Sequence, residues 1–354
     1  MGVFSKSVRL DREYEQILEC VRQQMRQKPL PLAISGMPPV VENAFTAAFT
    51  QDFTDAFGCG ILILMPDDKS VIRLTEYLRA QGIDAYRFVR REWNLYNITA
   101  SHENEHERLF VLSKILAEQF SAVVTTPAAA LGYTMPRAVL DAYRFCYRVG
   151  DIANLQDTAS LLLEMGYARV ESVDYPGQFS VRGGILDVFP PQEAENRLPY
   201  RIEFFGDEID RICVFDPLTQ RGAENYESVW ILPVHEVLYG QKEREAIRKK
   251  VEACLKKCES EDGRKELLQE IAAIDGGQPL HFADKYISLI YPQKECLLEY
   301  FSQKTAVLFC GTNALREQTE ALGRLEGELI TGLLEHGVIS GGTVEFSAPG
   351  TRLD

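Results

Sequence analysis

The chain has 354 residues, of which 45% are hydrophobic and 25% charged, so it is long enough to build two or three domains. Its formal net charge of −14 excludes a protein whose whole surface attracts DNA, because nonspecific DNA affinity comes from cations that neutralise phosphates. A local basic patch stays open around Arg87, Arg90, Arg91 and Trp93, with ordinary solvated surface as its alternative.

Residue usage also predicts the cellular compartment. No run of about 18 apolar residues occurs, and the amino terminus lacks the apolar stretch of a secretory signal. The eight cysteines are scattered through apolar runs, as is typical of buried thiols in a reducing cytosol. We therefore expect a cytoplasmic protein with no membrane partner and no disulfide framework.

Short apolar runs alternate with helical stretches in the first part of the chain. Apolar residues at helical spacing predict a helix at 12–27, and a second helix is expected at 67–80. The runs that we expect to be strands are PLAIS (31–35), GILILM (60–65), DAYRFV (84–89) and AVVTT (122–126). This alternation predicts an α/β domain built on a largely parallel sheet.

The pattern changes after a helix expected at 154–165. From 167 to 233 almost every segment has the character of a strand or a turn, which predicts a small, mostly antiparallel β domain carrying one helix. Two charged helical stretches follow, near 239–258 and 262–273, and then a strand and a helix. This layout indicates an α/β domain that is interrupted by the β-rich insert and completed by the C-terminal third of the chain.

Strand alternation predicts the two faces of the β-rich insert. In RIEFF (201–205), Ile202 and Phe204 point to one face, and Arg201 and Phe205 point to the other. The same rule, applied to QFSVR, places Arg182 opposite the apolar residues of its strand. Arg182, Arg201 and Phe205 are therefore expected on one polar face, where a large aromatic ring calls for a partner that covers it.

The residues alone leave a second interpretation of this face open. Phe205 packs under a loop in this alternative, and the arginines pair locally with Glu203 or Asp187. If the face is exposed instead, substitutions there should leave folding almost unchanged, since such changes shift stability by no more than about 0.5 kcal/mol.

Two segments carry a resemblance to known proteins, YPGQFSVRGGILDVFPP (175–191) and YRIEFFGDEIDRICVFDPLTQR (200–221). They resemble the second domain shared by the excinuclease subunit UvrB and the transcription-repair coupling factors. The resemblance implies a UvrB-like module, in which a RecA-like or Rossmann-type α/β domain in two halves (1–143 and 233–354) is interrupted by a mostly antiparallel β-rich, α+β domain (144–232). It also implies that the β-rich domain binds UvrA through Arg182, Arg201 and Phe205.

The segment ISGMPPVVENAF (34–45) favours the coupling factors over UvrB. An ATP site there needs a ring of backbone N–H groups, a lysine and a Ser or Thr hydroxyl, but proline has no amide hydrogen and no Gly-Lys pair occurs in the chain. We expect a degenerate nucleotide site at Gly36, Met37, Pro38 and Pro39, with no cofactor and no catalytic residue. The segment at 91–104 is also too short for the tyrosine-rich DNA-gripping hairpin of UvrB, although a UvrB-type ATP-dependent subunit stays the alternative.

The resemblance further implies that the chain is a fragment of a longer protein. Other parts of that protein are expected to bind RNA polymerase and DNA and to use ATP and Mg²⁺ for translocation, which displaces stalled polymerase. The function implied for this region is to recruit UvrA to RNA polymerase stalled at DNA lesions.

The sequence HENEH (102–106) matches the zinc-protease pattern, in which two histidines one helical turn apart bind zinc and the glutamate acts as general base. A zinc hydrolase is therefore a distant alternative. No third ligand stands out downstream and the segment begins a charged helix, so we expect no metal there. Cys254 and Cys258 lie one helical turn apart without a second ligand pair, and we interpret them as helix-face residues.

Overall fold

The computed structural model describes residues 7–24, 31–96, 101–193, 197–339 and 344–353. The chain divides into two compact units, each assembled from three segments. Unit 1 comprises Met1–Val89, Lys114–Ala130 and Phe301–Thr319, and unit 2 comprises Arg90–Ser113, Leu131–Tyr300 and Glu320–Asp354. Within the described ranges, no helix has both the length and the apolar character needed to cross a membrane.

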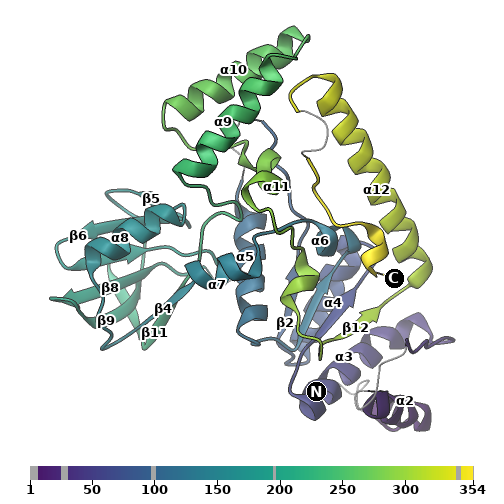
Figure 1. The fold of residues 1–354 in the computed structure, drawn as a ribbon. Helices are drawn as coiled ribbons and strands as arrows, with labels where there is room; N and C mark the ends of the chain where they lie inside the picture. The colour runs from purple at the N-terminus through teal and green to yellow at the C-terminus, as the bar shows by residue number, and fades with distance from the viewer. Residues whose placement is uncertain (1–6, 25–30, 97–100, 194–196, 340–343, 354) are drawn as a thin grey trace. The chain divides into compact units, whose positions relative to one another are not determined.

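Unit 1 contains a four-stranded, all-parallel sheet with the strand order β12-β1-β3-β2 (Figure 1). The strands are β1 (Ile61–Leu64), β2 (Ala85–Phe88), β3 (Ala122–Thr125) and β12 (Ala306–Phe309). Strands β1 and β3 are buried along their whole length, which explains their continuous apolar runs. The sheet confirms the predicted α/β class, and β12 brings a late segment of the chain into it.

Helices surround this sheet in the pattern of an α/β domain. Helix α3 (Pro39–Phe57) packs against β1, and α4 (Asp68–Ala80) packs against β2 and β3. Asp67 caps α4, because its carboxylate accepts a hydrogen bond from the Ser70 N–H at 2.9 Å. The other helices with residues in this unit are α2 (Arg12–Gln24), α6 (Pro127–Leu131), the end of α5 (Glu103–Leu116) and the start of α12 (Thr312–Glu335).

The strand predicted at 31–35 is wrong. Residues 31–38 have no regular structure, and Leu32 and Ile34 are exposed rather than packed in a sheet. A short apolar run becomes a strand only where a neighbouring strand satisfies its backbone groups, and none of the strands that the structure describes pairs with this segment. The first helix is confirmed at Arg12–Gln24, and the predicted continuation over 25–27 lies outside the described residues.

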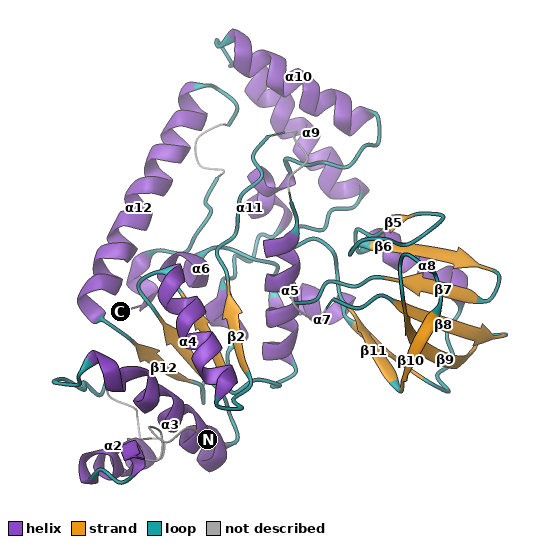
Figure 2. Cartoon of the chain, turned by 180° about the vertical axis from the view of Figure 1, so that it is seen from behind, coloured by secondary structure: helices purple, strands orange, loops and turns teal. Residues whose placement is uncertain are grey.

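The β-rich part of unit 2 has a six-stranded sheet, in the order β10-β9-β8-β7-β6-β5, and a two-stranded sheet of β11 and β4 (Figure 2). The pairings are antiparallel except for β5 with β6. Apolar residues of the six-stranded sheet form one core with helix α8 (Leu155–Glu164). The strands are β4 (Phe145–Arg148), β5 (Ala168–Arg169), β6 (Gln178–Arg182), β7 (Ile185–Val188), β8 (Tyr200–Phe205), β9 (Glu208–Phe215), β10 (Gly222–Tyr226) and β11 (Ser228–Ile231). The predicted antiparallel domain with one helix is confirmed.

The remainder of unit 2 is mainly helical. Helices α9 (Gln241–Leu255) and α10 (Glu261–Asp275) pack against each other, which confirms the two charged helices expected there. The other elements are α7 (Arg137–Tyr143), α11 (Ile287–Ile290) and the 3-10 helices η2 (Ala283–Tyr286), η3 (Leu297–Tyr300) and η4 (Gly350–Leu353).

A buried ionic cluster joins α5 to the segment that follows β11. Glu236 is fully buried and accepts hydrogen bonds from Arg108 Nε at 2.5 Å, from Arg91 Nη1 at 3.1 Å and from the Thr134 hydroxyl. Arg91 also binds Asp284, with 2.5 Å between Nη2 and Oδ1. Because both carboxylates have guanidinium partners, this part of unit 2 can bury charge.

Candidate partner-binding face of the β-rich domain

Phe205 lies at the exposed end of the β8–β9 hairpin. It pairs with Glu208 across a two-residue turn, in which Gly206 adopts a φ of +64° that glycine tolerates without strain. The Phe205 side chain is 82% exposed, whereas Ile202 on the opposite face is fully buried. The predicted alternation is confirmed, and the alternative in which Phe205 packs under a loop is wrong.

Arg182 and Arg201 converge on one carboxylate, that of Asp187. Arg201 binds it through two nitrogens, with Nε to Oδ1 at 2.7 Å and Nη2 to Oδ2 at 2.8 Å. Arg182 Nη2 reaches the same Oδ2 at 2.6 Å. The strand register explains why the three side chains meet. Asp187 on β7 lies directly opposite Arg201 on β8, and it points to the same face of the sheet as Arg182 on β6. The arginines therefore make the local pairing that the sequence left open.

The two arginines differ in exposure. The Arg182 side chain is 49% exposed, whereas that of Arg201 is only 14% exposed. Arg201 also donates from Nη1 to the Gln220 carbonyl at 3.0 Å and lies over the Phe215 ring at 5.0 Å, and its hydrogen bond with Asp187 raises its pKa. Arg201 is therefore not on the open face that the sequence analysis expected, and we expect its replacement to affect folding, because its guanidinium contacts the turn after β9.

A second exposed apolar residue, which sequence reasoning missed, flanks the same hairpin. Ile152 forms an isolated bridge with Glu208, the residue that also pairs with Phe205. Directly opposed residues in a sheet point to the same side, so Phe205, Glu208 and Ile152 form one row. Ile152 is 74% exposed. We name this row of three residues the hairpin row; no local signal in the sequence identifies Ile152, because the bridge joins distant segments.

The predicted degenerate nucleotide segment lies at the start of α3. Gly36 has a φ of +80°, Met37 is half-buried, Pro38 occupies the N-cap and Pro39 is the first helical residue. Helices bind phosphate through the free N–H groups of this first turn, and the two prolines supply none. The backbone therefore lacks two donors of a phosphate-binding loop.

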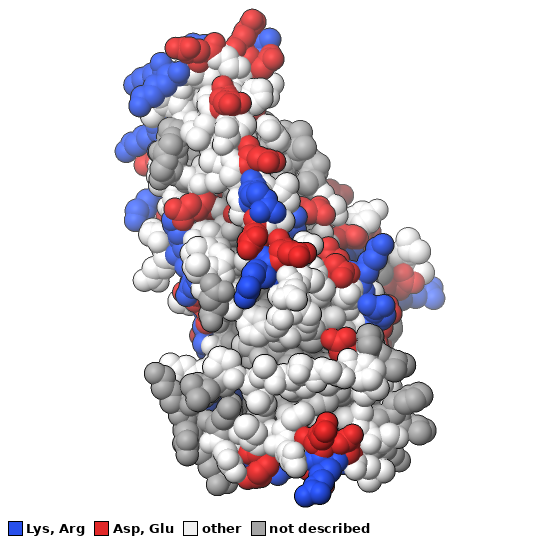
Figure 3. Space-filling view, turned by 90° about the vertical axis from the view of Figure 1, so that its right-hand side faces the viewer, with Lys and Arg blue, Asp and Glu red and all other residues white. Residues whose placement is uncertain are grey.

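The basic segment near Trp93 is not an open DNA-binding patch at Arg91. Arg91 is buried by its ion pairs with Glu236 and Asp284, and it stacks over the Trp93 ring at 4.7 Å. Trp93 in turn packs on Phe346 at 5.0 Å, which confirms its interpretation as a packing residue. On the face shown in Figure 3, acidic and basic side chains are interspersed.

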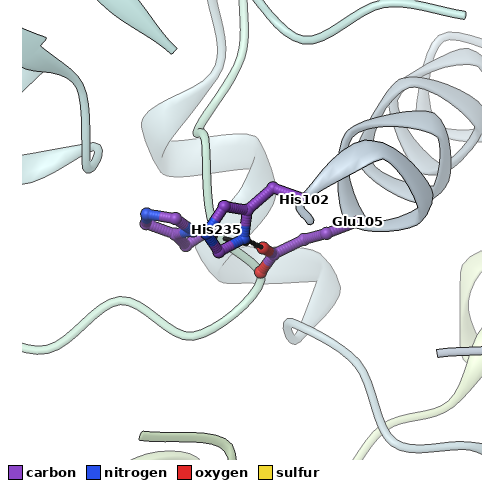
Figure 4. Close-up of side chains that lie close together, drawn as sticks. All are labelled: His102, Glu105 and His235. Carbon is purple, nitrogen blue, oxygen red and sulfur yellow. Dashed lines mark hydrogen bonds and ion pairs between the residues drawn. The ribbon is translucent and has the colours of Figure 1, made fainter. Parts of the chain in front are cut away.

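The HENEH segment does not form the zinc-protease arrangement. Glu103, the expected general base, binds Arg197 at 3.0 Å, and the His106 side chain is buried. A histidine that did not stand out in the sequence nevertheless lies beside this segment. His235 approaches His102 and Glu105, as Figure 4 shows, and the three side chains form a group suited to a metal ion.

The β-rich domain matches a known family. Residues 146–236, from β4 to just beyond β11, match the model of the UvrB interaction domain. The chain is 33% identical to the transcription-repair-coupling factor of Bacillus subtilis (strain 168) over 315 residues. This match includes 86% of the chain and 26% of that protein. Over 296 residues, 80% of this chain, it is 25% identical to that of Escherichia coli (strain K12), of which it covers 24%. The chain is a homologue of the UvrB-like region of transcription-repair coupling factors.

UvrB itself is also related to this coupling-factor homologue. The UvrABC system protein B of Thermosipho africanus (strain TCF52B) is 31% identical over 157 residues, 44% of this chain and 23% of that protein. The chain thus spans about a quarter of the length of the curated relatives it matches. The parallel sheet and the separate β-rich domain agree with this likeness to UvrB and to the coupling factors.

Proposed function

We propose that this coupling-factor homologue recruits UvrA and that the hairpin row of the β-rich domain is the centre of the contact. One observation carries the proposal: within the domain that matches the UvrB interaction family, Phe205 exposes 82% of its surface to solvent. An exposed aromatic ring on a rigid hairpin is a suitable interface anchor, because it buries a large area at low entropic cost. Ile152 extends the apolar surface beside it.

The two arginines on the adjacent strands have different roles in this proposal. Arg182 is half-exposed, and Asp187 holds one of its nitrogens, so the rest of its guanidinium can receive a partner's carboxylate without searching many rotamers. Arg201 contributes by positioning Asp187, since its own side chain is largely covered. We therefore propose Phe205 and Arg182 as direct contacts and Arg201 as their support.

Measurement of UvrA affinity by titration calorimetry tests this assignment. Phe205→Ala and Arg182→Ala should each weaken binding by about 2 kcal/mol or more, roughly 30-fold, if the two side chains are buried anchors. Leu268→Ala, at an exposed leucine of α10, is the matched control for Phe205, and Lys249→Ala on α9 is the control for Arg182. Wild-type affinity in both hairpin-face variants would contradict the proposal, provided that the controls also bind normally.

The proposal extends to the organisation of the whole protein. We assign residues 1–143 and 233–354 to the two halves of the α/β domain and residues 144–232 to the adapter. Two observations support this division: β12 pairs with β1, and the family match begins at residue 146. RNA polymerase and DNA binding, and translocation driven by ATP and Mg²⁺, belong in this proposal to other parts of the protein. The adapter region would bring UvrA to RNA polymerase stalled at a lesion.

A UvrB-type ATP-dependent subunit is the second candidate, favoured by the 31% identity to UvrABC system protein B over 157 residues. The prolines at the start of α3 oppose it, because they remove two phosphate donors. Titration with ATP and Mg²⁺, and phosphate release with and without DNA, distinguish the candidates. We expect neither binding nor turnover, and micromolar ATP affinity would favour the UvrB alternative.

A further inference from the structure

Histidines gather at the start of α5 in unit 2. Four of the chain's five histidines lie in this region. His102 stacks with His106, with 6.2 Å between the ring centroids, and packs edge-on against His235 at 4.7 Å. His281 lines a pocket of about 110 Å³ together with His102, Glu105 and His235. The UvrA-binding proposal uses none of these residues.

Two imidazoles in this pocket point at the same carboxylate oxygen (Figure 4). His102 Nδ1 lies 2.8 Å from Glu105 Oε2, and His235 Nδ1 lies 3.2 Å from the same atom. All three ligand atoms lie within 4.8 Å of one another. Tetrahedral zinc, at about 2.0–2.1 Å from each ligand, places neighbouring ligand atoms about 3.3 Å apart. The three side chains are therefore already close to the spacing of a zinc centre.

The backbone fixes the carboxylate for this role. Glu105 follows His102 by one helical turn, which places both side chains on one side of α5. The second carboxylate oxygen, Oε1, accepts the Glu236 N–H at 2.6 Å. Because His235 directly precedes Glu236, this bond also brings the second imidazole to the site. Oxygen Oε2 is thus held between the two rings, as an outer hydrogen bond orients a metal-binding carboxylate.

The surrounding charges favour a cation. The guanidiniums of Arg91 and Arg108 pair with Glu236 and Asp284, whereas the ion-pair partners of Glu105 are imidazoles. Two guanidiniums thus face three carboxylates, which leaves a negative charge for a cation to balance.

We propose that His102, Glu105 and His235 bind a zinc ion. Two imidazole nitrogens and one carboxylate oxygen form a donor set that zinc accepts, whereas Mg²⁺ and Ca²⁺ prefer oxygen ligands alone. The two rings are 36% and 35% exposed, so solvent reaches the fourth position. The ion would tie the segment leaving the β-rich domain to the start of α5.

Zinc titration of the untagged whole chain, first dialysed against a chelator, tests the proposal. We expect one equivalent of zinc to bind and to raise the melting temperature, since an ion that binds only the folded chain stabilises it. His102→Ala and His235→Ala should each weaken zinc affinity by at least about 10-fold, the lower end of losses caused even by outer-shell changes. Both rings are partly exposed, so these variants should fold, which circular dichroism without zinc verifies.

The control is His336→Ala, at the exposed histidine outside the cluster, which should bind zinc as the wild type does. Glu105 is left unchanged because its second oxygen holds the backbone at Glu236. The proposal fails if no saturable zinc binding occurs at neutral pH. It fails equally if the folded His102→Ala and His235→Ala variants retain wild-type affinity, because the zinc would then reside elsewhere.

Discussion

Replacing Asp187 with alanine should destabilise the β-rich domain strongly. The carboxylate is almost fully buried and lies within 2.8 Å of three guanidinium nitrogens, two from Arg201 and one from Arg182. Removing one partner of a buried ion pair costs about 3–5 kcal/mol, because the other charge stays buried without compensation. The half-exposed Arg182 adds less than about 1 kcal/mol. Arg201 keeps the Gln220 carbonyl, so the lower end of the range applies, about 3 kcal/mol.

Urea unfolding measures this loss in the domain itself. The chain has two tryptophans, and Trp230 lies on β11, so a Trp93→Phe background leaves a fluorophore that reports on the β-rich domain. With a slope of about 1–3 kcal/mol per molar urea, a loss of 3 kcal/mol lowers the midpoint by at least about 1 M. The change should appear without zinc and without UvrA, because the ion pair is internal to the domain.

Glu203→Ala is the control on the same sheet face. Glu203 pairs with Arg211 at 3.3 Å, but the two side chains are 33% and 41% exposed, so the pair is worth at most about 1 kcal/mol. A midpoint shift for Asp187→Ala no larger than that for Glu203→Ala would refute the reasoning. In that case, water would solvate the Arg201 guanidinium as well as Asp187 does.

Two further predictions concern pH and packing. His106 is 6% exposed, and its Nε2 has no hydrogen-bond partner among the described residues; burial lowers its pKa to about 4 from an ordinary 6.5. Between these two values the unfolded chain binds a proton that the folded chain does not bind. The free energy of unfolding therefore falls by up to about 3 kcal/mol from pH 7 to 4. His106→Leu should remove this contribution, so its urea midpoint should fall less over this pH range than that of the wild type. A Cβ added at Gly60 would lie 2.7 Å from the Phe120 carbonyl oxygen, whereas one added at Gly323 in α12 meets nothing within 4 Å. Gly60→Ala should thus lower the melting temperature, at a cost of about 1–3 kcal/mol, while Gly323→Ala should raise it slightly; equal effects would contradict the packing argument.

Local signals predicted the elements whose causes are local. The helix at 68–80 follows from its Asp67 cap, and RIEFF shows its two faces because side chains alternate along any strand. PLAIS carries the same kind of signal but remains a loop, because strand formation depends on a neighbour that the run itself does not specify.

The features that sequence reasoning missed depend on contacts between distant residues. Whether Arg201 points to solvent or to Asp187 is decided by the register of β7 and β8, and Ile152 joins the hairpin row only through its bridge to Glu208. His235 is 130 positions from Glu105, so the HENEH pattern alone directs attention to His106 and away from the actual neighbour. The resemblance supplied Arg182, Arg201 and Phe205, and the tertiary structure shows that Arg201 differs from the other two in being largely covered.

The pairing of β12 with β1 has a consequence for synthesis on the ribosome. Strand β3 ends at Thr125 and β12 begins at Ala306. The ribosome therefore synthesises the entire β-rich domain before the outer strand of the parallel sheet is available. At about 5–20 residues per second, the wait is on the order of 10–40 s. The hairpins of the β-rich domain need only nearby segments and can close during that time, whereas β1 presents an unpaired edge. Nascent chains should therefore be most prone to aggregate before β12 arrives.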